Sequence, residues 1–156
     1  MLKCYFASPF FNEEQVEREE ALKKILRDKG IKVYSPKEEC LLAPNASLIE
    51  RNKVFQDNIT SIANADFIFA ITDGKDVGTI WECGFAYALE VPILYFCETL
   101  GTNPFNVMLS SSSMGVFRSR EEVVENLLIK VDEKYNKCYI DYRRIREKQE
   151  FVGDTQ

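Results

Sequence analysis

At 156 residues, with 46% apolar and 29% charged residues, the chain has the composition of one globular domain, which excludes a disordered or fibrous protein. Its net charge of −5, without a dense basic run, argues against nucleic acid as a partner because a polyanion would be repelled. Histidine is absent, which excludes Ser-His and Cys-His nucleophile pairs and removes the commonest metal ligand. Acid–base chemistry therefore falls to carboxylates, tyrosines or lysines, and we expect neither a metal site nor a cofactor.

The cysteine pattern indicates a reducing compartment. Five cysteines, an odd number, are widely spaced and form no CxxC pair, which is typical of reduced core thiols rather than of a zinc site or a disulfide framework. The N-terminal apolar run is too short for a signal peptide, and no apolar stretch reaches the roughly 18 residues that span a bilayer. We expect a cytoplasmic protein without a membrane partner.

Short apolar runs alternate with segments of helical periodicity. Strands are expected at residues 2–7, 31–34, 66–72, 91–96 and 114–117. Helices are expected at residues 12–30, 45–65, 79–90 and 120–135, with loops at 37–44 and 73–78 and with Asn12 and Asn45 as N-caps. This alternation predicts a single α/β domain with a doubly wound, parallel, five-stranded sheet of the flavodoxin or Rossmann type. Sheets of this type bind ligands at the carboxyl ends of their strands.

The domain is expected to cover residues 1–136 and to be followed by a charged C-terminal tail at residues 137–156. The tail has weak periodicity, so a frayed helix, an arm that reaches a neighbouring subunit and a disordered segment all stay open for it.

The densest group of chemically useful side chains lies at residues 73–84, where Asp76 and Glu82 flank a turn at Gly78 and a helix start. A carboxylate over a helix N-terminus stays ionised, and a pair of carboxyl groups can divide the roles of nucleophile and acid. The spacing from Thr79 to Glu82 also fits a capping box, in which Glu82 would only bond the Thr79 N–H. Spacing alone favours the capping box.

Three further positions could contact a ligand. Asn58 lies toward the apolar stripe of its helix, so its amide needs a partner, either a ligand or a backbone group. Tyr5 ends the first strand and could hold a carboxylate, and Phe10 with Phe11 could sandwich a planar base. Asn106 and Met108 lie in an apolar loop and could reach a ligand hydroxyl or pack on a sugar. Core aromatics and a solvated amide are the plain alternatives.

Four segments together resemble the nucleoside 2-deoxyribosyltransferase family. They are Tyr5-Phe-Ala-Ser-Pro-Phe-Phe-Asn12, Phe55-Gln-Asp-Asn-Ile-Thr-Ser-Ile-Ala-Asn-Ala-Asp66, Asp76-Val-Gly-Thr-Ile-Trp-Glu82-Cys-Gly-Phe-Ala86 and Asn106-Val-Met108. Each segment alone is weak evidence for the family, but the four occur in the family's order over about residues 3–130. The resemblance therefore raises the catalytic interpretation of Glu82 above the capping box.

The resemblance implies that the chain exchanges the nucleobase of a 2′-deoxynucleoside in two steps. Glu82 matches the carboxylate that attacks C1′ and forms a covalent deoxyribosyl ester. Asp76 matches the acid that protonates the leaving base and deprotonates the incoming one, and Tyr5 the tyrosine that orients the nucleophile. The implied partners are a deoxynucleoside and a free nucleobase, in a nucleotide salvage reaction.

The resemblance also implies the substrate contacts and the assembly. Asn58, Phe11 and Gly78 are expected to contact the substrate. Asn106 and Met108 match residues that the family contributes from an adjacent subunit, which implies a homo-oligomer with shared active sites, a hexamer or another dimer-based assembly.

Asn58 is a departure, because many members carry Asp there. An amide can still bond a sugar hydroxyl but cannot share a proton with Glu82, so the pKa of the nucleophile is expected to differ. Residues 36–40 match a base-contacting region, and the choice between purines and all bases stays open.

Two other functions also remain open. One is hydrolysis of the N-glycosidic bond of deoxynucleosides or their 5′-monophosphates, and the other is non-catalytic nucleoside binding. The loop around Asn106 carries no Arg to cradle a phosphate, which favours a free 5′-hydroxyl.

Overall fold

The computed structural model describes residues 1–148, with the backbone alone for the last three. Its centre is a five-stranded parallel sheet in the order β2-β1-β3-β4-β5. The strands are β1 Lys3–Ala7, β2 Lys32–Tyr34, β3 Phe67–Ile71, β4 Ile93–Phe96 and β5 Gly115–Phe117. The α/β sheet expected from the sequence is confirmed, and every strand lies within two residues of its expected bounds.

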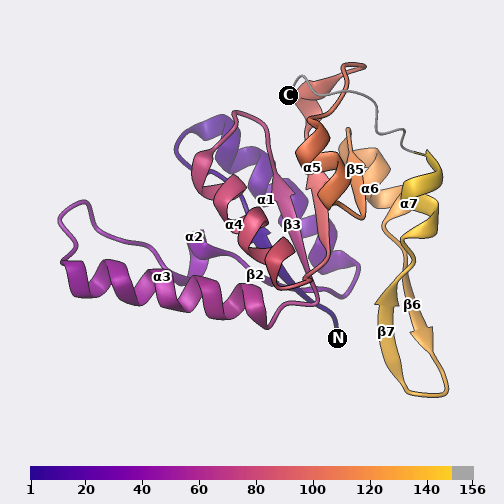
Figure 1. Cartoon of the computed structure of the whole chain (residues 1–156), viewed down its shortest axis with the longest axis horizontal. Coiled ribbons are helices and arrows are strands. Elements are labelled where there is room, and N and C mark those ends of the chain that lie inside the picture. The colour runs from indigo at the N-terminus through magenta and orange to yellow at the C-terminus, as the bar shows by residue number, and fades with distance from the viewer. Residues whose placement is uncertain (149–156) are drawn as a thin grey trace.

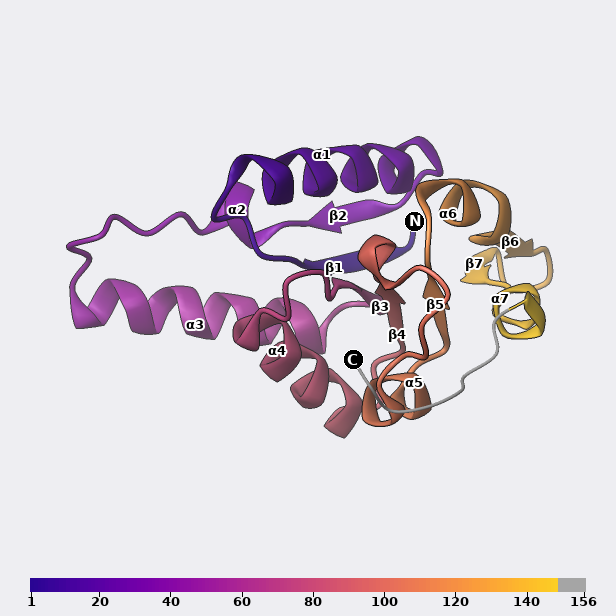
Figure 2. The same cartoon turned by 90° about the horizontal axis from the view of Figure 1, so that it is seen from above.

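Helices cover both faces of this sheet, as Figure 2 shows. α1 (Glu13–Asp28) and α6 (Arg120–Asn126) lie on one face, and α3 (Leu48–Ala63), α4 (Val77–Ala88) and α5 (Val107–Ser112) lie on the other. A short 3₁₀ turn, η1, follows β4 at Glu98–Leu100. The strand order changes direction between β1 and β3, which is where a doubly wound sheet opens a crevice for ligands.

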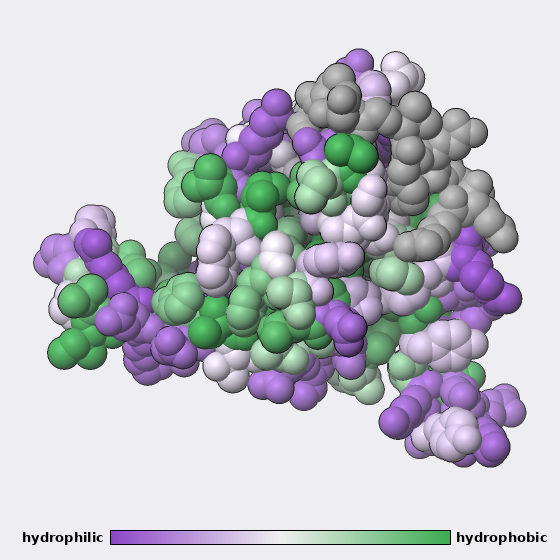
Figure 3. Space-filling view, viewed as in Figure 1, coloured by the Kyte–Doolittle hydropathy of each residue, from purple (hydrophilic) through white to green (hydrophobic). Residues whose placement is uncertain are grey.

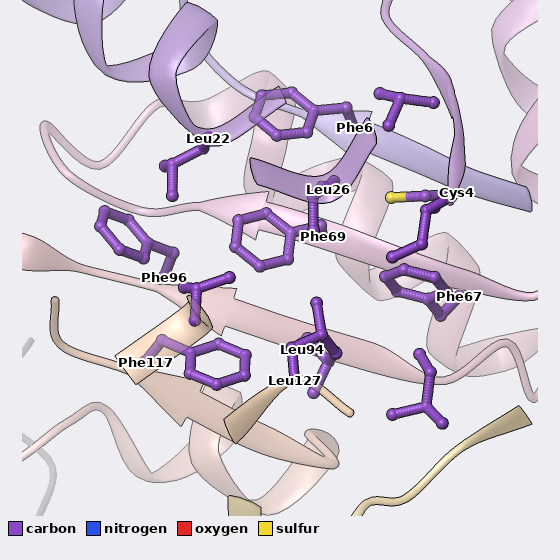
Figure 4. Close-up of a cluster of buried hydrophobic side chains, with 14 of the residues drawn as sticks. Cys4, Phe6, Leu22, Leu26, Phe67, Phe69, Leu94, Phe96, Phe117 and Leu127 are labelled. Atoms are coloured by element: carbon purple, nitrogen blue, oxygen red, sulfur yellow. The ribbon is translucent and has the colours of Figure 1, made fainter. Parts of the chain in front are cut away.

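Alternation along the strands divides the core into two clusters. Figure 4 shows the cluster under α1, where Phe6, Phe69 and Phe96 meet Leu22 and Leu26 of the helix. The alternate side chains, among them Tyr5 and Tyr95, form the second cluster under α3, α4 and α5. Tyr5 therefore points to the face on which α4 carries Glu82.

Two local expectations between β2 and α3 were wrong. Residues 36–39 of the expected loop form a short helix, α2 (Pro36–Glu39), because Pro36 supplies a preset φ at its first position. The N-cap of α3 is Ser47 rather than Asn45: Ser47 Oγ accepts from the Glu50 N–H, and the Glu50 carboxylate accepts from the Ser47 N–H. The N-terminal end of α3 extends beyond the sheet (Figures 1 and 2).

The helix expected at residues 120–135 ends at Asn126, and an antiparallel hairpin follows it. β6 (Ile129–Asp132) alternates apolar and charged residues, a strand pattern, and pairs with β7 (Lys137–Ile140). Asp132 Oδ1 accepts from the backbone of Lys134 and Tyr135, and Asn136 has a φ of 50°, so this turn closes the hairpin. The domain boundary expected at residue 136 falls within that turn.

Part of the segment expected as a tail packs against the sheet. α7 (Arg143–Lys148) places Ile145 in the core against β5, and Ile140 is also buried. Residues 149–156 of the expected tail lie outside the described residues. Within residues 1–148, no helix combines the length and apolar character needed to cross a membrane.

The close contact between Gly115 of β5 and Ile145 of α7 allows a test of how α7 packs on the sheet. A Cβ at Gly115 would overlap Cγ2 of Ile145, so Gly115→Ala is expected to lower the free energy of unfolding by about 1–3 kcal/mol. Gly84→Ala in α4 is the matched control, because its new Cβ meets no atom within 4 Å and a helix gains about 0.5–1 kcal/mol from the change. Urea denaturation measures both, and wild-type stability of Gly115→Ala would contradict this packing.

Candidate active site

Asp76 begins α4 and is held there by two hydrogen bonds. Its Oδ2 accepts from the Thr79 backbone N–H at 2.8 Å and from the Thr79 hydroxyl at 3.0 Å. Gly78 leaves room for this carboxylate, because a Cβ there would lie 3.2 Å from Asp76 Oδ2. Asp76 Oδ1 has no hydrogen bond to any described residue and remains available to a ligand.

This cap contradicts the capping-box interpretation of Glu82. Thr79 is the third residue of α4 rather than its N-cap, and its backbone N–H is already bonded to Asp76. Glu82 therefore has no helix-capping bond to make. Sequence spacing alone favoured the cap because the helix was expected to begin at Thr79, whereas it begins at Val77.

The Glu82 carboxyl group lies beside the Tyr5 hydroxyl in a largely desolvated place. Each group shifts the pKa of the other through charge and hydrogen-bond interactions, and Tyr5 Oη and Glu82 Oε2 are two of the three buried polar side-chain atoms that lack a hydrogen bond of standard geometry among the described residues. Burial above all raises the pKa of Glu82 to about 7; the Tyr5 hydroxyl lowers it and the Asp76 charge raises it. Buried polar groups normally find partners, so two unpartnered atoms here indicate a site for a ligand.

A cleft of about 370 Å³ opens in front of Glu82, between α3 and α4. Its lining residues are Phe55, Asn58, Ile59, Ile62, Gly78, Trp81 and Glu82. Phe55 and Trp81 have ring centroids 5.6 Å apart at 56°, and both rings are partly exposed. This volume falls within the range of small-ligand pockets, and the aromatic wall suits a flat or apolar ligand. The sequence reasoning missed both aromatics, although each lies next to or one helical turn from a predicted residue.

Asn58 lines the cleft, and the oxygen of its side-chain amide already accepts a hydrogen bond. The Tyr34 hydroxyl donates to Asn58 Oδ1 at 3.3 Å, and the Cys40 Sγ lies 2.9 Å from the same hydroxyl. The sequence did not identify the hydrogen-bond partner of the Asn58 amide, and the structure shows that it is the Tyr34 hydroxyl. Asp57, the neighbouring acid, points elsewhere and pairs with Lys53.

Of the predicted site residues, Asn58, Gly78 and Glu82 line this cleft. Tyr5 and Asp76 interact with Glu82 without lining it, and the remaining three residues lie elsewhere. Asn106 and Met108 line a separate pocket with Ile80, across α4 from Glu82, and Met108 is 74% exposed. Asn106 is the N-cap of α5, with its Oδ1 bonded to the backbone of Met108 and Leu109. Phe11 is 75% exposed and stacks on Phe10 above α1. The contact of Phe11 with a base stays a prediction.

The polar side chains that line the cleft are the Glu82 carboxyl group and the Asn58 amide, and the Tyr5 hydroxyl and the Asp76 carboxyl group interact with Glu82. In the described part of the chain, no cluster of three or more Cys, Asp or Glu side chains could hold a metal ion. The arrangement suits nucleophilic attack by Glu82 with proton transfer by a second carboxyl group.

The raised pKa of Glu82 makes stability depend on pH. Between the ordinary value of 4.5 and about 7 the folded protein keeps the proton that the unfolded chain has lost, so stability falls as pH rises through this window. The two values differ by about 2.5, equivalent to about 3 kcal/mol, and partial solvation reduces the expected effect to about 1–2 kcal/mol.

Glu82→Gln is therefore expected to be more stable than the wild type at pH 8 by about 1–2 kcal/mol and equal to it near pH 4. Denaturant unfolding across this pH range checks the difference. Glu125→Gln changes an exposed residue of α6 and should leave the wild-type profile unchanged. An identical profile for Glu82→Gln and wild type would mean that Glu82 is not desolvated.

Comparison with known proteins agrees with this geometry. The sequence profile of the nucleoside 2-deoxyribosyltransferase family matches residues 4–128. A 2-deoxyribosyltransferase from the psychrotolerant bacterium Bacillus psychrosaccharolyticus is 35% identical, with a TM-score of 0.71 over 79% of this chain and 90% of that one. A conserved protein of Enterococcus faecalis V583 is 27% identical, with a TM-score of 0.54 over 62% of this chain and 63% of that one.

The CMP N-glycosidase BcmB of Clostridium botulinum shares the fold at 16% identity, with a TM-score of 0.55 over 79% of this chain and 96% of that one. No match was found among curated proteins. Because the family profile matches most of the chain and a solved relative is 35% identical over 79% of it, the chain belongs to the nucleoside 2-deoxyribosyltransferase family.

Proposed function

We propose that the chain transfers a 2-deoxyribosyl group between nucleobases, with Glu82 as the nucleophile. The observation that carries the proposal is the Glu82 carboxyl group at the α3–α4 cleft, which lies beside Tyr5 and has no backbone or cationic partner among the described residues. A structural carboxylate would have found a partner, whereas a nucleophile must stay free for the electrophilic carbon. Membership of the family and the 2-deoxyribosyltransferase of Bacillus psychrosaccharolyticus support the same reaction.

In the first step, an ionised Glu82 oxygen bonds to C1′ while the bond from C1′ to the base nitrogen breaks. The electron pair of that bond stays on the base, which takes a proton, and the deoxyribose remains as an ester of Glu82. In the second step, a nitrogen of another base attacks C1′, loses its proton and releases the Glu82 carboxylate. Two inversions retain the configuration at C1′.

Asp76 is proposed as the acid and base of these steps. Oδ2 is held by Thr79, so Oδ1 is the atom that would carry the proton. Tyr5 is proposed to orient Glu82 through the hydroxyl beside it. Asn58 and Gly78 are proposed as substrate contacts because both line the cleft.

The proposed active form is a homo-oligomer with shared sites. Asn106 and Met108 line a different pocket from that of Glu82 in their own chain, and we propose that they reach the Glu82 cleft of a neighbouring copy. Figure 3 shows hydrophobic surface over α4 and at the free end of α3. Exposed apolar side chains there include Ile49, Val77, Trp81 and Met108. Such surface is typical of an interface.

The transfer is tested by incubating the protein with thymidine and adenine, and separately with deoxyadenosine and thymine. Formation of the exchanged deoxynucleoside, followed by chromatography, is expected. Glu82→Ala should reduce it by about 10³-fold or more, with Glu125→Gln as the unaffected control. On the acid side, kcat/KM should fall with an apparent pKa near 7, because the attacking carboxylate must be ionised.

Asp76→Asn keeps the helix cap, since Asn caps as well as Asp, and should lower transfer by about 10²-fold or more for bases that need a proton. Free deoxyribose without exchange would indicate a hydrolase. Absence of turnover with retained binding would indicate a nucleoside-binding module.

Shared sites are tested by mixing two variants, Glu82→Ala and Asn106→Ser. Serine preserves the N-cap of α5 but is too short to replace the amide, so each variant alone should be nearly inactive. Co-assembly should restore activity, because sites form in which Glu82 comes from one variant and Asn106 from the other. If the activity of the mixture equals the sum of the activities of the two separate variants, Glu82 and Asn106 of one site come from the same subunit.

A further inference from the structure

We propose that Tyr34 is a positioning residue that holds the Asn58 amide in place at the Glu82 cleft through a hydrogen bond to Asn58 Oδ1. Neither residue attacks the substrate in the mechanism above. The inference rests on the proposed function in one respect: the ligand of the cleft is taken to be a deoxynucleoside.

Sheet register brings Tyr34 to the site. Tyr34 ends β2 directly opposite Tyr5 of β1, and their rings stack with centroids 5.5 Å apart at an angle of 19°. Tyr34 thus packs against the ring whose hydroxyl lies beside Glu82, while its own hydroxyl points to α3. Asn58 of α3 completes the connection between the edge of the sheet and the cleft.

Tyr34, Asn58 and Cys40 form one hydrogen-bonded group. The single O–H of Tyr34 donates to Asn58 Oδ1 at 3.3 Å. The Cys40 Sγ lies 2.9 Å from the same oxygen, and either atom can donate in that bond. Tyr34 thus links the Asn58 amide to Cys40 at the end of α2.

A held amide restricts what can bind opposite it. With its Oδ1 bonded to Tyr34, the Asn58 side chain has its NH₂ group available to donate to a sugar hydroxyl oxygen or to an ionised carboxylate. Loss of the Tyr34 hydroxyl would remove the hydrogen bond that holds the amide in this position.

Kinetics of Tyr34→Phe test this role, because phenylalanine keeps the ring stack with Tyr5 and removes only the hydroxyl. Loss of one hydrogen bond is expected to lower kcat/KM for thymidine about three- to tenfold, mainly through a higher KM. In an Asn58→Ala background the same change should alter kcat/KM by less than about twofold, since the two residues act through one contact. Equal losses in both backgrounds, or no loss in either, would overturn the proposal.

Tyr142→Phe is the matched control. It removes the hydroxyl of a partly buried tyrosine that packs against the core on the other face of the sheet, under α1. Its kinetic constants should equal those of the wild type. If removing a tyrosine hydroxyl lowered activity only by destabilising the protein, both Tyr34→Phe and Tyr142→Phe would lose activity.

A measurement without substrate separates this proposal from the proposed function. The Asn58 NH₂ pair can be assigned in a ¹H–¹⁵N spectrum by its disappearance in Asn58→Ala. It should shift in Tyr34→Phe and stay in place in Tyr142→Phe. An unchanged Asn58 resonance in Tyr34→Phe would overturn the role of Tyr34 even if transfer occurs. A shift together with wild-type transfer by Glu82→Ala would overturn the proposed function and leave the amide orientation intact.

Discussion

The bond from the Thr79 backbone N–H to the Asp76 carboxylate decides what Glu82 can do. A helix start leaves backbone N–H groups that a nearby carboxylate will bind. If α4 began after Thr79, that N–H would be open to Glu82, and the side chain would be consumed as a cap. Because Asp76 takes the bond at 2.8 Å, Glu82 lies further along the helix with no backbone group to satisfy it. It therefore faces the cleft as a free carboxyl group.

The burial of Glu82 also makes its ionised form energetically unfavourable in the folded protein. Burial against Tyr5 and the α3 side of the sheet raises its pKa to about 7, so ionising it in the folded protein costs stability. Active sites commonly hold such groups, because a desolvated carboxylate interacts more strongly with developing positive charge than a solvated one does. Two extensively packed faces of the sheet can offset this local cost.

α4 separates two pockets whose residues are complementary in chemistry. The Glu82 cleft carries the Glu82 carboxyl group and an aromatic wall, and the pocket across the helix carries Asn106 and Met108. In the proposed arrangement a second copy completes the site, and the exposed apolar side chains nearby would join the two copies. Reaction and assembly would then depend on the same helix.

Much of the fold was already determined by the sequence, because strands buried on both faces are continuous apolar runs and helices carry their own caps. The strands containing Tyr5 and Phe69 and the helix capped by Asn12 follow from local pattern. The hairpin after Asn126 did not, because its apolar residues fit a helix as well as a strand until β6 and β7 pair. The residue types for catalysis were also visible. Only the tertiary structure decided that Glu82 is buried beside Tyr5, that Tyr34 bonds Asn58, and that Asn106 lines another pocket. These contacts join segments that are far apart in the chain, and no local pattern of residues contains them.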